Sequence, residues 1–290
     1  FKINIIFTRY KMKRGLICGF LFFCLAFQAQ QYKKLRQDAA DACKKGQYKD
    51  AIRLSEEALN QLRSKKTSES EKLVLRSENA VYYVFDEQVQ KGLNLLAVCS
   101  KESQNHSAGT EAQVLKNYAT GLIFLGAFAE AKPLLEKAQP VYSASGFPVD
   151  EYLSLLTALA ACYHNTYDFV SSEKTYIKTV SLIEKEKTLT SIDVAAVYSG
   201  LALLYRDMLR NREAENLYEK AYKVFLADSD TLNPQFPALL SDMGTLMAEQ
   251  YRFKEALQLI RRAIRSDLSI YGEHSFTHAA DLNNLGYTYN

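Results

Sequence analysis

The feature that most constrains this chain is a pattern that returns about every 42 residues. Ala202, Gly244 and Gly286 lie 42 residues apart. The same spacing separates the matched sets Tyr205, Met247 and Tyr289, Ala214 and Ala256, Tyr218 and Ile260, and Ala221 and Ala263. Self-similarity at a fixed period is typical of a repeat array, in which each unit packs on its neighbours. We therefore expect one continuous array rather than two separate globular domains.

Each period contains two stretches in which apolar residues recur three or four positions apart. Residues 191–211 contain one such stretch and residues 212–225 contain the other. This spacing places an apolar stripe on one face of a helix. Small residues at fixed points, such as Ala202 and Ala214, allow the two helix axes to approach closely. Each unit is therefore predicted to be a pair of helices.

The same register extends back to the start of the array. A marker position in the first helix holds a small residue in every unit, in the series Ala39, Ala80, Ala119, Ala160, Ala202, Gly244 and Gly286, with steps of 41, 39, 41, 42, 42 and 42 residues. The sequence thus predicts an all-α solenoid of stacked antiparallel helix pairs over residues 30–290, with about six full repeats and the first helix of a seventh. Because solenoids normally end in a polar capping helix, we expect the array to be truncated at Asn290 and the chain to be a fragment of a longer protein.

Two stretches resemble tetratricopeptide repeats (TPRs). They are KKGQYKDAIRLSEEALN (44–60) and EQYRFKEALQLIRRAIR (249–265), which are similar to the turn and second helix of that motif. The period near 42 and the run YGEHSFTHAADLNNLGYTYN resemble the longer repeats of kinesin light chains and many bacterial arrays. This resemblance implies a right-handed superhelix that binds proteins. The second repeat departs from the motif, with Glu87 and Val89 where a glycine and an aromatic residue are usual.

Residues 12–29 are predicted to be a secretory signal peptide. Met12 opens a short basic start, and residues 15–27 form an uncharged apolar run. A membrane helix needs about 20 apolar residues, whereas a shorter run is typical of a signal peptide. Cleavage is expected after Ala29, and the alternative is an uncleaved N-terminal anchor. Residues 1–11 precede the expected start, and the mature protein is expected in the periplasm or outside the cell, with no membrane span.

Charge and cysteine content narrow the possible partners and folds. Residues 1–29 hold five basic residues and no acidic one, so of the 36 basic and 33 acidic residues the remainder keeps 31 and 33. No basic face therefore argues for a nucleic-acid partner. Cys43, Cys99 and Cys162 are odd in number and far apart, so no disulfide framework is predicted. Cys99 and Cys162 are expected to be buried and Cys43 partly exposed.

No motif in the sequence indicates catalysis or cofactor binding. A nucleophile elbow, a phosphate loop, an HExxH motif and a CxxC pair are all absent from the sequence. His274 and His278 lie four residues apart, but no third ligand lies in register with them, so a metal site is not predicted. No catalytic, cofactor-binding or metal-binding residue is therefore assigned.

The remaining candidate is a binding surface. In stacked helix pairs the first helices line the inside of the superhelix, where an extended peptide or a partner helix can lie. The residues predicted to line this groove are Lys33, Arg36, Lys44, Lys116, Asn117, Thr120, His164, Asn165, Arg206, Asp207, Glu249, Asn283 and Tyr287. The N-terminal end of the groove is expected to be basic and the later units mixed in charge.

The predicted function is a non-catalytic protein–protein interaction scaffold that binds a peptide or a partner protein in this groove. The alternative is the N-terminal recognition or sensing arm of a larger exported enzyme or receptor. Arrays of this long-repeat type resemble those joined to caspase-like CHAT peptidases or to signalling kinases, and the catalytic part would then lie beyond Asn290. That alternative rests on a likeness of architecture and on no catalytic residue of this chain.

Overall fold

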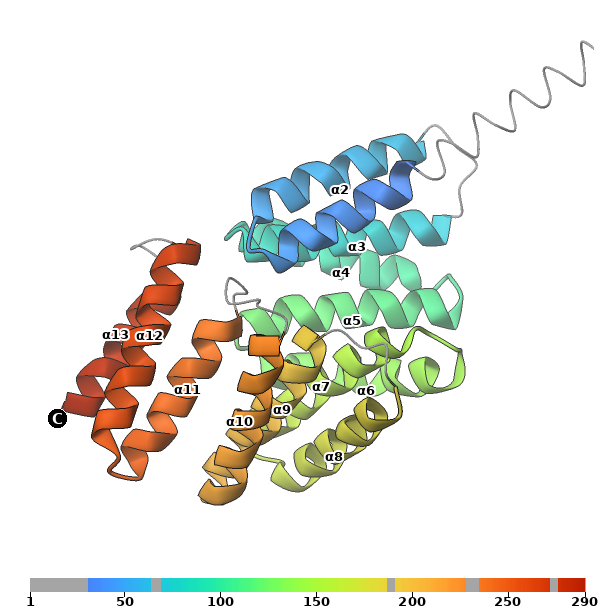
Figure 1. Ribbon diagram of the computed structural model, residues 1–290. Helices are drawn as coiled ribbons and strands as arrows, with labels where there is room; N and C mark the ends of the chain where they lie inside the picture. The colour runs from blue at the N-terminus through green and yellow to red at the C-terminus, as the bar shows by residue number, and fades with distance from the viewer. Residues whose placement is uncertain (1–30, 64–68, 187–190, 228–234, 272–275, 290) are drawn as a thin grey trace, which may run out of the picture.

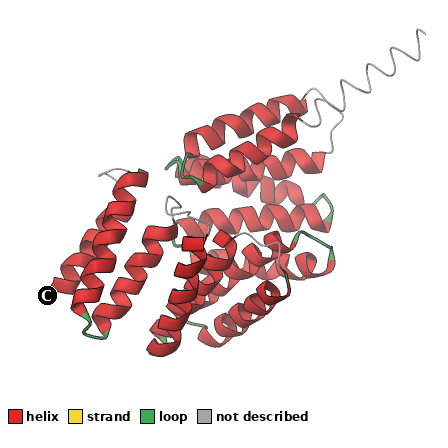
Figure 2. Cartoon of the chain, viewed as in Figure 1, coloured by secondary structure: helices red, strands yellow, loops and turns green. Residues whose placement is uncertain are grey.

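The computed structural model describes residues 31–63, 69–186, 191–227, 235–271 and 276–289. The predicted signal peptide lies outside the described residues, as does His274. Within the described ranges the chain consists of helices joined by turns, and it contains no strand there (Figure 2). None of the described helices is long and apolar enough to cross a membrane.

The helices follow one another along the array in antiparallel pairs (Figure 1). The first pair joins a helix over residues 31–44 to α2 (Tyr48–Arg63). The next pairs are α3 (Glu69–Phe85) with α4 (Val89–Ser103), α5 (Ala108–Phe124) with α6 (Phe128–Ala144), α7 (Val149–Asn165) with α8 (Phe169–Lys185), α9 (Ser191–Asp207) with α10 (Asn211–Ala227), and α11 (Gln235–Glu249) with α12 (Phe253–Tyr271). Helix α13 (Phe276–Tyr289) packs against α12 and α11. The predicted all-α solenoid of stacked helix pairs is confirmed.

Three columns of small residues hold the pairs together. The marker position of the first helices forms one column, and the second helices supply the other two. These are Ala51, Gly92, Ala131, Ser172, Ala214 and Ala256 in one column, and Ala58, Cys99, Ala138, Thr179, Ala221 and Ala263 in the other, all of them buried. In the fourth pair the Ser172 hydroxyl donates a 2.8 Å hydrogen bond to the carbonyl oxygen of Ala160, the marker residue of the facing helix. Residue size is thus selected wherever helices approach closely, because protein interiors are close-packed.

Each first helix ends in the same left-handed turn, whether or not a glycine is present. The second residue after the helix has a positive φ in all six pairs: 72° at Gly46, 63° at Glu87, 76° at Gly126, 61° at Tyr167, 59° at Leu209 and 61° at Tyr251. The amide of the following residue then bonds to a carbonyl five residues back, as from Arg210 to Tyr205 at 2.8 Å. This is the Schellman arrangement, which satisfies carbonyl groups left over at the helix end.

The second repeat is therefore regular in spite of its sequence. Glu87 adopts the left-handed conformation that a glycine adopts in the first and third repeats, and the Gln88 amide bonds to the Tyr83 carbonyl at 2.9 Å. Helix α4 begins at Val89, where the motif usually places an aromatic residue. Tertiary packing has overridden a local preference that opposes this turn by about 1 kcal/mol.

Replacing Leu209 by Gly is expected to raise the free energy of unfolding by about 0.5–1 kcal/mol. The Leu209 side chain is 84% exposed, so its removal loses little packing, while glycine adopts φ > 0 without steric cost. Chemical denaturation of the purified chain measures the change. Leu209→Ala is the control and should give no gain, because alanine keeps the Cβ that disfavours this conformation. A destabilised Leu209→Gly variant would contradict the expected strain at the turn.

The cysteines lie where the sequence predicts. Cys99 and Cys162 are buried, Cys43 is partly exposed, and all three are free thiols. Burial raises the pKa of the Cys43 and Cys162 thiols to about 12 and that of Cys99 to about 11. All three therefore stay protonated at neutral pH, when a thiol reacts poorly.

Candidate functional site

The first helices form the inner face of the array. Each of α3, α5, α7, α9 and α11 contacts the next first helix, and no comparable contact joins successive second helices among the described residues. An array whose inner helices approach each other more closely than its outer ones must curve toward the inner side. Polar bonds cross this face between repeats, as from Asn117 Nδ2 to Ser77 Oγ at 2.8 Å and from Asn284 Nδ2 to Ser241 Oγ at 2.8 Å.

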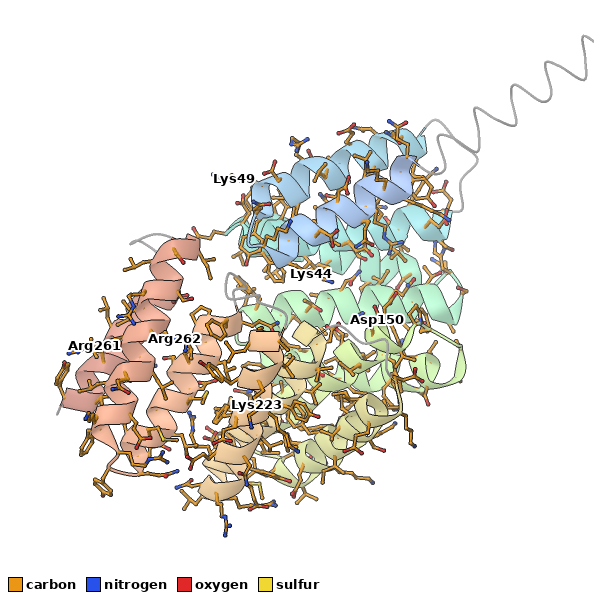
Figure 3. The ribbon with its side chains drawn as sticks, viewed as in Figure 1. Lys44, Lys49, Asp150, Lys223, Arg261 and Arg262 are labelled. Atoms are coloured by element: carbon orange, nitrogen blue, oxygen red, sulfur yellow. The ribbon has the colours of Figure 1, made fainter. Side chains whose placement is uncertain are left out.

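A cavity of about 720 Å³ lies on this face in the N-terminal half of the array. It is lined by the helix over residues 31–44 and by α3, α5 and α7. Six of the residues predicted for the groove line it: Lys33, Arg36, Lys44, Lys116, Asn117 and Thr120. Lys44 lies at the turn end of its helix, on the side toward α5 (Figure 3). The packing of the repeats thus brings together residues that lie up to 87 positions apart in the sequence.

The basic character expected of this end is reduced, because carboxylates from α3 and α7 line the same cavity. Glu71, Glu78 and Glu151 all contribute to its walls. Arg36 Nε donates to Glu78 Oε2 at 2.8 Å, and a second guanidinium nitrogen donates to the other carboxylate oxygen. Lys116 lies 3.7 Å from Glu151. The cavity is therefore of mixed charge, and Lys33 and Lys44 are the cations in its lining without an ion-pair partner in the described part of the chain.

Lys116 lies at the centre of this arrangement. Its side chain is 17% exposed, and its ammonium lies 5.5 Å from the centre of the Tyr142 ring. Burial lowers the pKa of Lys116, and the negative charges of Glu151, Glu78 and Asp150 oppose that shift. Because a cation with so little water around it is weakly screened, a bound anion interacts with it more strongly than with an exposed lysine.

Aromatic side chains of the cavity were missed in the sequence. Tyr82 and Phe85 of α3 line it. The Phe85 ring packs 5.5 Å from Tyr48 and 4.7 Å from Phe124, in tilted geometry. The marker residue Ala80 places α3 in register with the other first helices. The predicted groove nevertheless contains no residue of α3, because Glu87 and Val89 depart from the motif. Phe85 was therefore detectable from the register alone.

A second polar cluster lies on the inner face toward the C-terminal end. His164 Nε2 and Asp207 Oδ2 are 2.8 Å apart, and Arg206 contacts Asp207 at 3.2 Å and Glu249 at 3.9 Å. These four predicted groove residues therefore form one network that joins α7, α9 and α11. His164 is only 6% exposed, so it acts as a link between repeats rather than as an open groove side chain.

The remaining predicted residues do not join either cluster. Asn165 is exposed, and its amide donates to the Ala161 carbonyl at 2.9 Å. Asn283 is exposed on α13. The side chain of Tyr287 lies outside the described residues. In the part of the chain that the structure describes, no group of three His, Cys, Asp or Glu residues could hold a metal ion.

Comparison with known proteins supports one family. The tetratricopeptide repeat family model matches residues 151–227. No curated protein sequence matches the chain.

Solved structures of low sequence identity share the fold. A putative kinesin light chain from Podospora anserina, built of nearly identical TPR-like repeats, is 18% identical, with a TM-score of 0.55 over 70% of this chain and 98% of that one. A tetratricopeptide repeat protein from Parabacteroides merdae is 17% identical, with a TM-score of 0.53 over 90% of this chain and 100% of that one. A Rap protein complexed with competence and sporulation factor is 16% identical, with a TM-score of 0.59 over 89% of this chain and 74% of that one. Residues 151–227 thus match the tetratricopeptide repeat family, and the helix pairs that flank them on both sides share the fold of the similar solved structures.

Proposed function

We propose that this protein is an interaction scaffold that binds a segment of a partner protein along its inner face. One observation carries the proposal, namely the cavity of about 720 Å³ lined by four first helices. A space of this size admits several side chains of a bound segment. Its lining combines aromatic rings with lysines and carboxylates, which suits a peptide better than a purely apolar ligand.

The electrostatics of the cavity support this function. Lys33 and Lys44 have no ion-pair partner in the described residues, and Lys116 is a poorly hydrated cation. Carboxylates of a partner would form ion pairs with these lysines, and charge-assisted hydrogen bonds are among the stronger hydrogen bonds. The Rap structure offers a parallel, since a protein of the same fold holds a bound factor.

Site-specific photocrosslinking in cells that carry the gene tests the proposal. A benzoylphenylalanine at position 120 places the reactive group in the cavity, because Thr120 lines it. Benzoylphenylalanine at position 130 is the matched control, since Glu130 is exposed on α6, which is the second helix of its pair. We expect a product with a partner protein from position 120 and none from position 130. Equal products from both positions, or none from position 120, would contradict binding at the inner face.

We also propose that the protein acts after export, on the basis of the basic start and apolar run of residues 12–29. Intact-mass measurement of protein secreted by a bacterial host should give an N-terminus at Gln30. Leu21→Arg should block processing, because an arginine in the middle of an apolar segment costs about 2.5–3.5 kcal/mol on insertion. A mature N-terminus at Met12 would instead support an uncleaved anchor.

A further inference from the structure

The last residues of the six first helices form a row that crosses the array. They are Lys44, Phe85, Phe124, Asn165, Asp207 and Glu249, separated by the same steps as the marker residues. We call these six residues the terminal row. Lys44, Phe124, Asn165, Asp207 and Glu249 are exposed, and Phe85 is half-buried. The row therefore presents a basic residue, two aromatic rings, an amide and two carboxylates in that order.

The basic end of the terminal row opens into the cavity. Lys44 and Phe85 both line the cavity. Lys44 has no ion-pair partner in the described ranges, so its charge is available to a ligand. The Phe124 ring beside Phe85 is 52% exposed, which leaves an apolar platform next to this charge.

The acidic end carries more negative charge than its surroundings balance. Asp207 and Glu249 terminate α9 and α11, where the partial negative charge of the helix C-terminus disfavours a carboxylate. Arg206 contacts both of them, and His164 Nε2 lies 2.8 Å from Asp207 Oδ2. Burial raises the pKa of Glu249, and Asp207 adds to that shift while Arg206 opposes it. The repulsion between these carboxylates decreases when a further cation binds near them.

A buried hydroxyl next to this end is also without a partner. Tyr218 is 1% exposed, and its hydroxyl has no hydrogen-bond partner in the described structure. Its pKa is raised by burial and by the charges of Asp242, Asp207 and Glu249, which lie around it. A buried polar group without a partner costs about 1–3 kcal/mol. Tyr218 is therefore a buried polar group beneath the acidic end of the row, and a ligand on the surface of the row does not reach its hydroxyl.

We infer that the terminal row binds an extended protein segment of segregated charge, with acidic residues at Lys44, an apolar residue on Phe85 and Phe124, and basic residues at Asp207 and Glu249. This inference rests on the proposed function and specifies the chemistry of the partner. Neighbouring helix axes lie about 8–10 Å apart, so the row is about 40–50 Å long. An extended chain rises about 3.3 Å per residue. The bound segment would therefore contain about 12–15 residues.

Selection from a displayed library of random 16-residue peptides tests this inference on the purified chain. The selected peptides should carry acidic residues toward one end and basic residues toward the other, with an apolar residue between them. Lys44→Glu and Glu249→Lys should each weaken the binding of a selected peptide by about three- to tenfold, because each turns an attraction between exposed charges into a repulsion. The matched controls Lys45→Glu and Glu57→Lys make the same charge changes at exposed positions outside the row and cavity, and should leave Kd within about twofold.

A second selection on the Lys44→Glu variant should enrich peptides whose acidic end has become basic. Circular dichroism of each variant should match that of the parent, since both substitutions are at exposed positions. Binders without charge order, or binders insensitive to both substitutions, would overturn the inference and leave the proposed function standing. A library that yields no binder would overturn the proposed function, and the inference with it.

Discussion

Replacing Ala131 by Trp is expected to lower the free energy of unfolding by about 3 kcal/mol. Ala131 is fully buried on α6, in the same packed cluster as Ala119 and Leu135. A Trp side chain has no room there, so α5 and α6 must move apart and lose contacts along both helices. For a chain of this size the melting temperature should fall by about 6–12 °C. Thermal unfolding followed by circular dichroism measures it.

The control for this substitution lies two residues away on the same helix. Ala129 is exposed in the first turn of α6, so Ala129→Trp should change the free energy of unfolding by less than about 0.5 kcal/mol. The two variants have the same composition and differ only in the face of the helix that carries the ring. A melting temperature of Ala131→Trp within 2 °C or so of the parent would refute the close approach of these helices.

Replacing Gly92 by Ala is expected to destabilise the second repeat by about 1–3 kcal/mol. An alanine Cβ at this position would lie 2.7 Å from the Ala80 carbonyl oxygen and 2.9 Å from the Val84 amide nitrogen. Both atoms belong to the backbone of α3, so no side-chain rotation relieves the contact. Helix propensity alone would favour alanine by about 1 kcal/mol, and steric overlap is expected to outweigh it. Urea unfolding gives the difference.

Gly109→Ala is the matched control, and its expected effect has the opposite sign. Gly109 lies in the first turn of α5, and an added Cβ would meet its nearest neighbour, in the Phe147 ring, at an ordinary 3.6 Å. The gain in helix propensity should therefore stabilise the protein by about 0.5 kcal/mol. Two glycine substitutions that shift stability in the same direction would show that contact with the facing helix does not decide the outcome.

The groove shows how far reasoning from sequence reaches. The repeat register correctly placed Lys33, Arg36, Lys44 and Lys116 around one space, since each repeat projects equivalent positions toward the same side. It failed for Glu78 and Phe85, because the atypical turn of the second repeat hid that α3 contributes to the lining. The basic character of the cavity is weaker than predicted for the same reason, since two of the three carboxylates in its lining come from that repeat.

The cysteines and the left-handed turns also show what can and cannot be predicted from the sequence. Burial of Cys99 was predictable, because it occupies the position that Ala221 and Ala263 hold in later repeats. The conformation of Glu87, Tyr167 and Leu209 was not predictable from local preference, because none of them favours a positive φ. The helices on either side fix the path of the chain, and the turn residue adopts whatever conformation joins them.

The sequence by itself determined the number of helix pairs, their register and the small residues between them, because close packing demands a particular side-chain size at each recurring contact. Only the tertiary structure decided which polar side chains meet, such as Arg36 with Glu78 and His164 with Asp207, each pair about one repeat apart. The reason is physical. Packing periodicity fixes the distance between repeats, whereas ion pairs depend on the small rotation of each repeat relative to the next, and that rotation is set by all the side chains of the interface together.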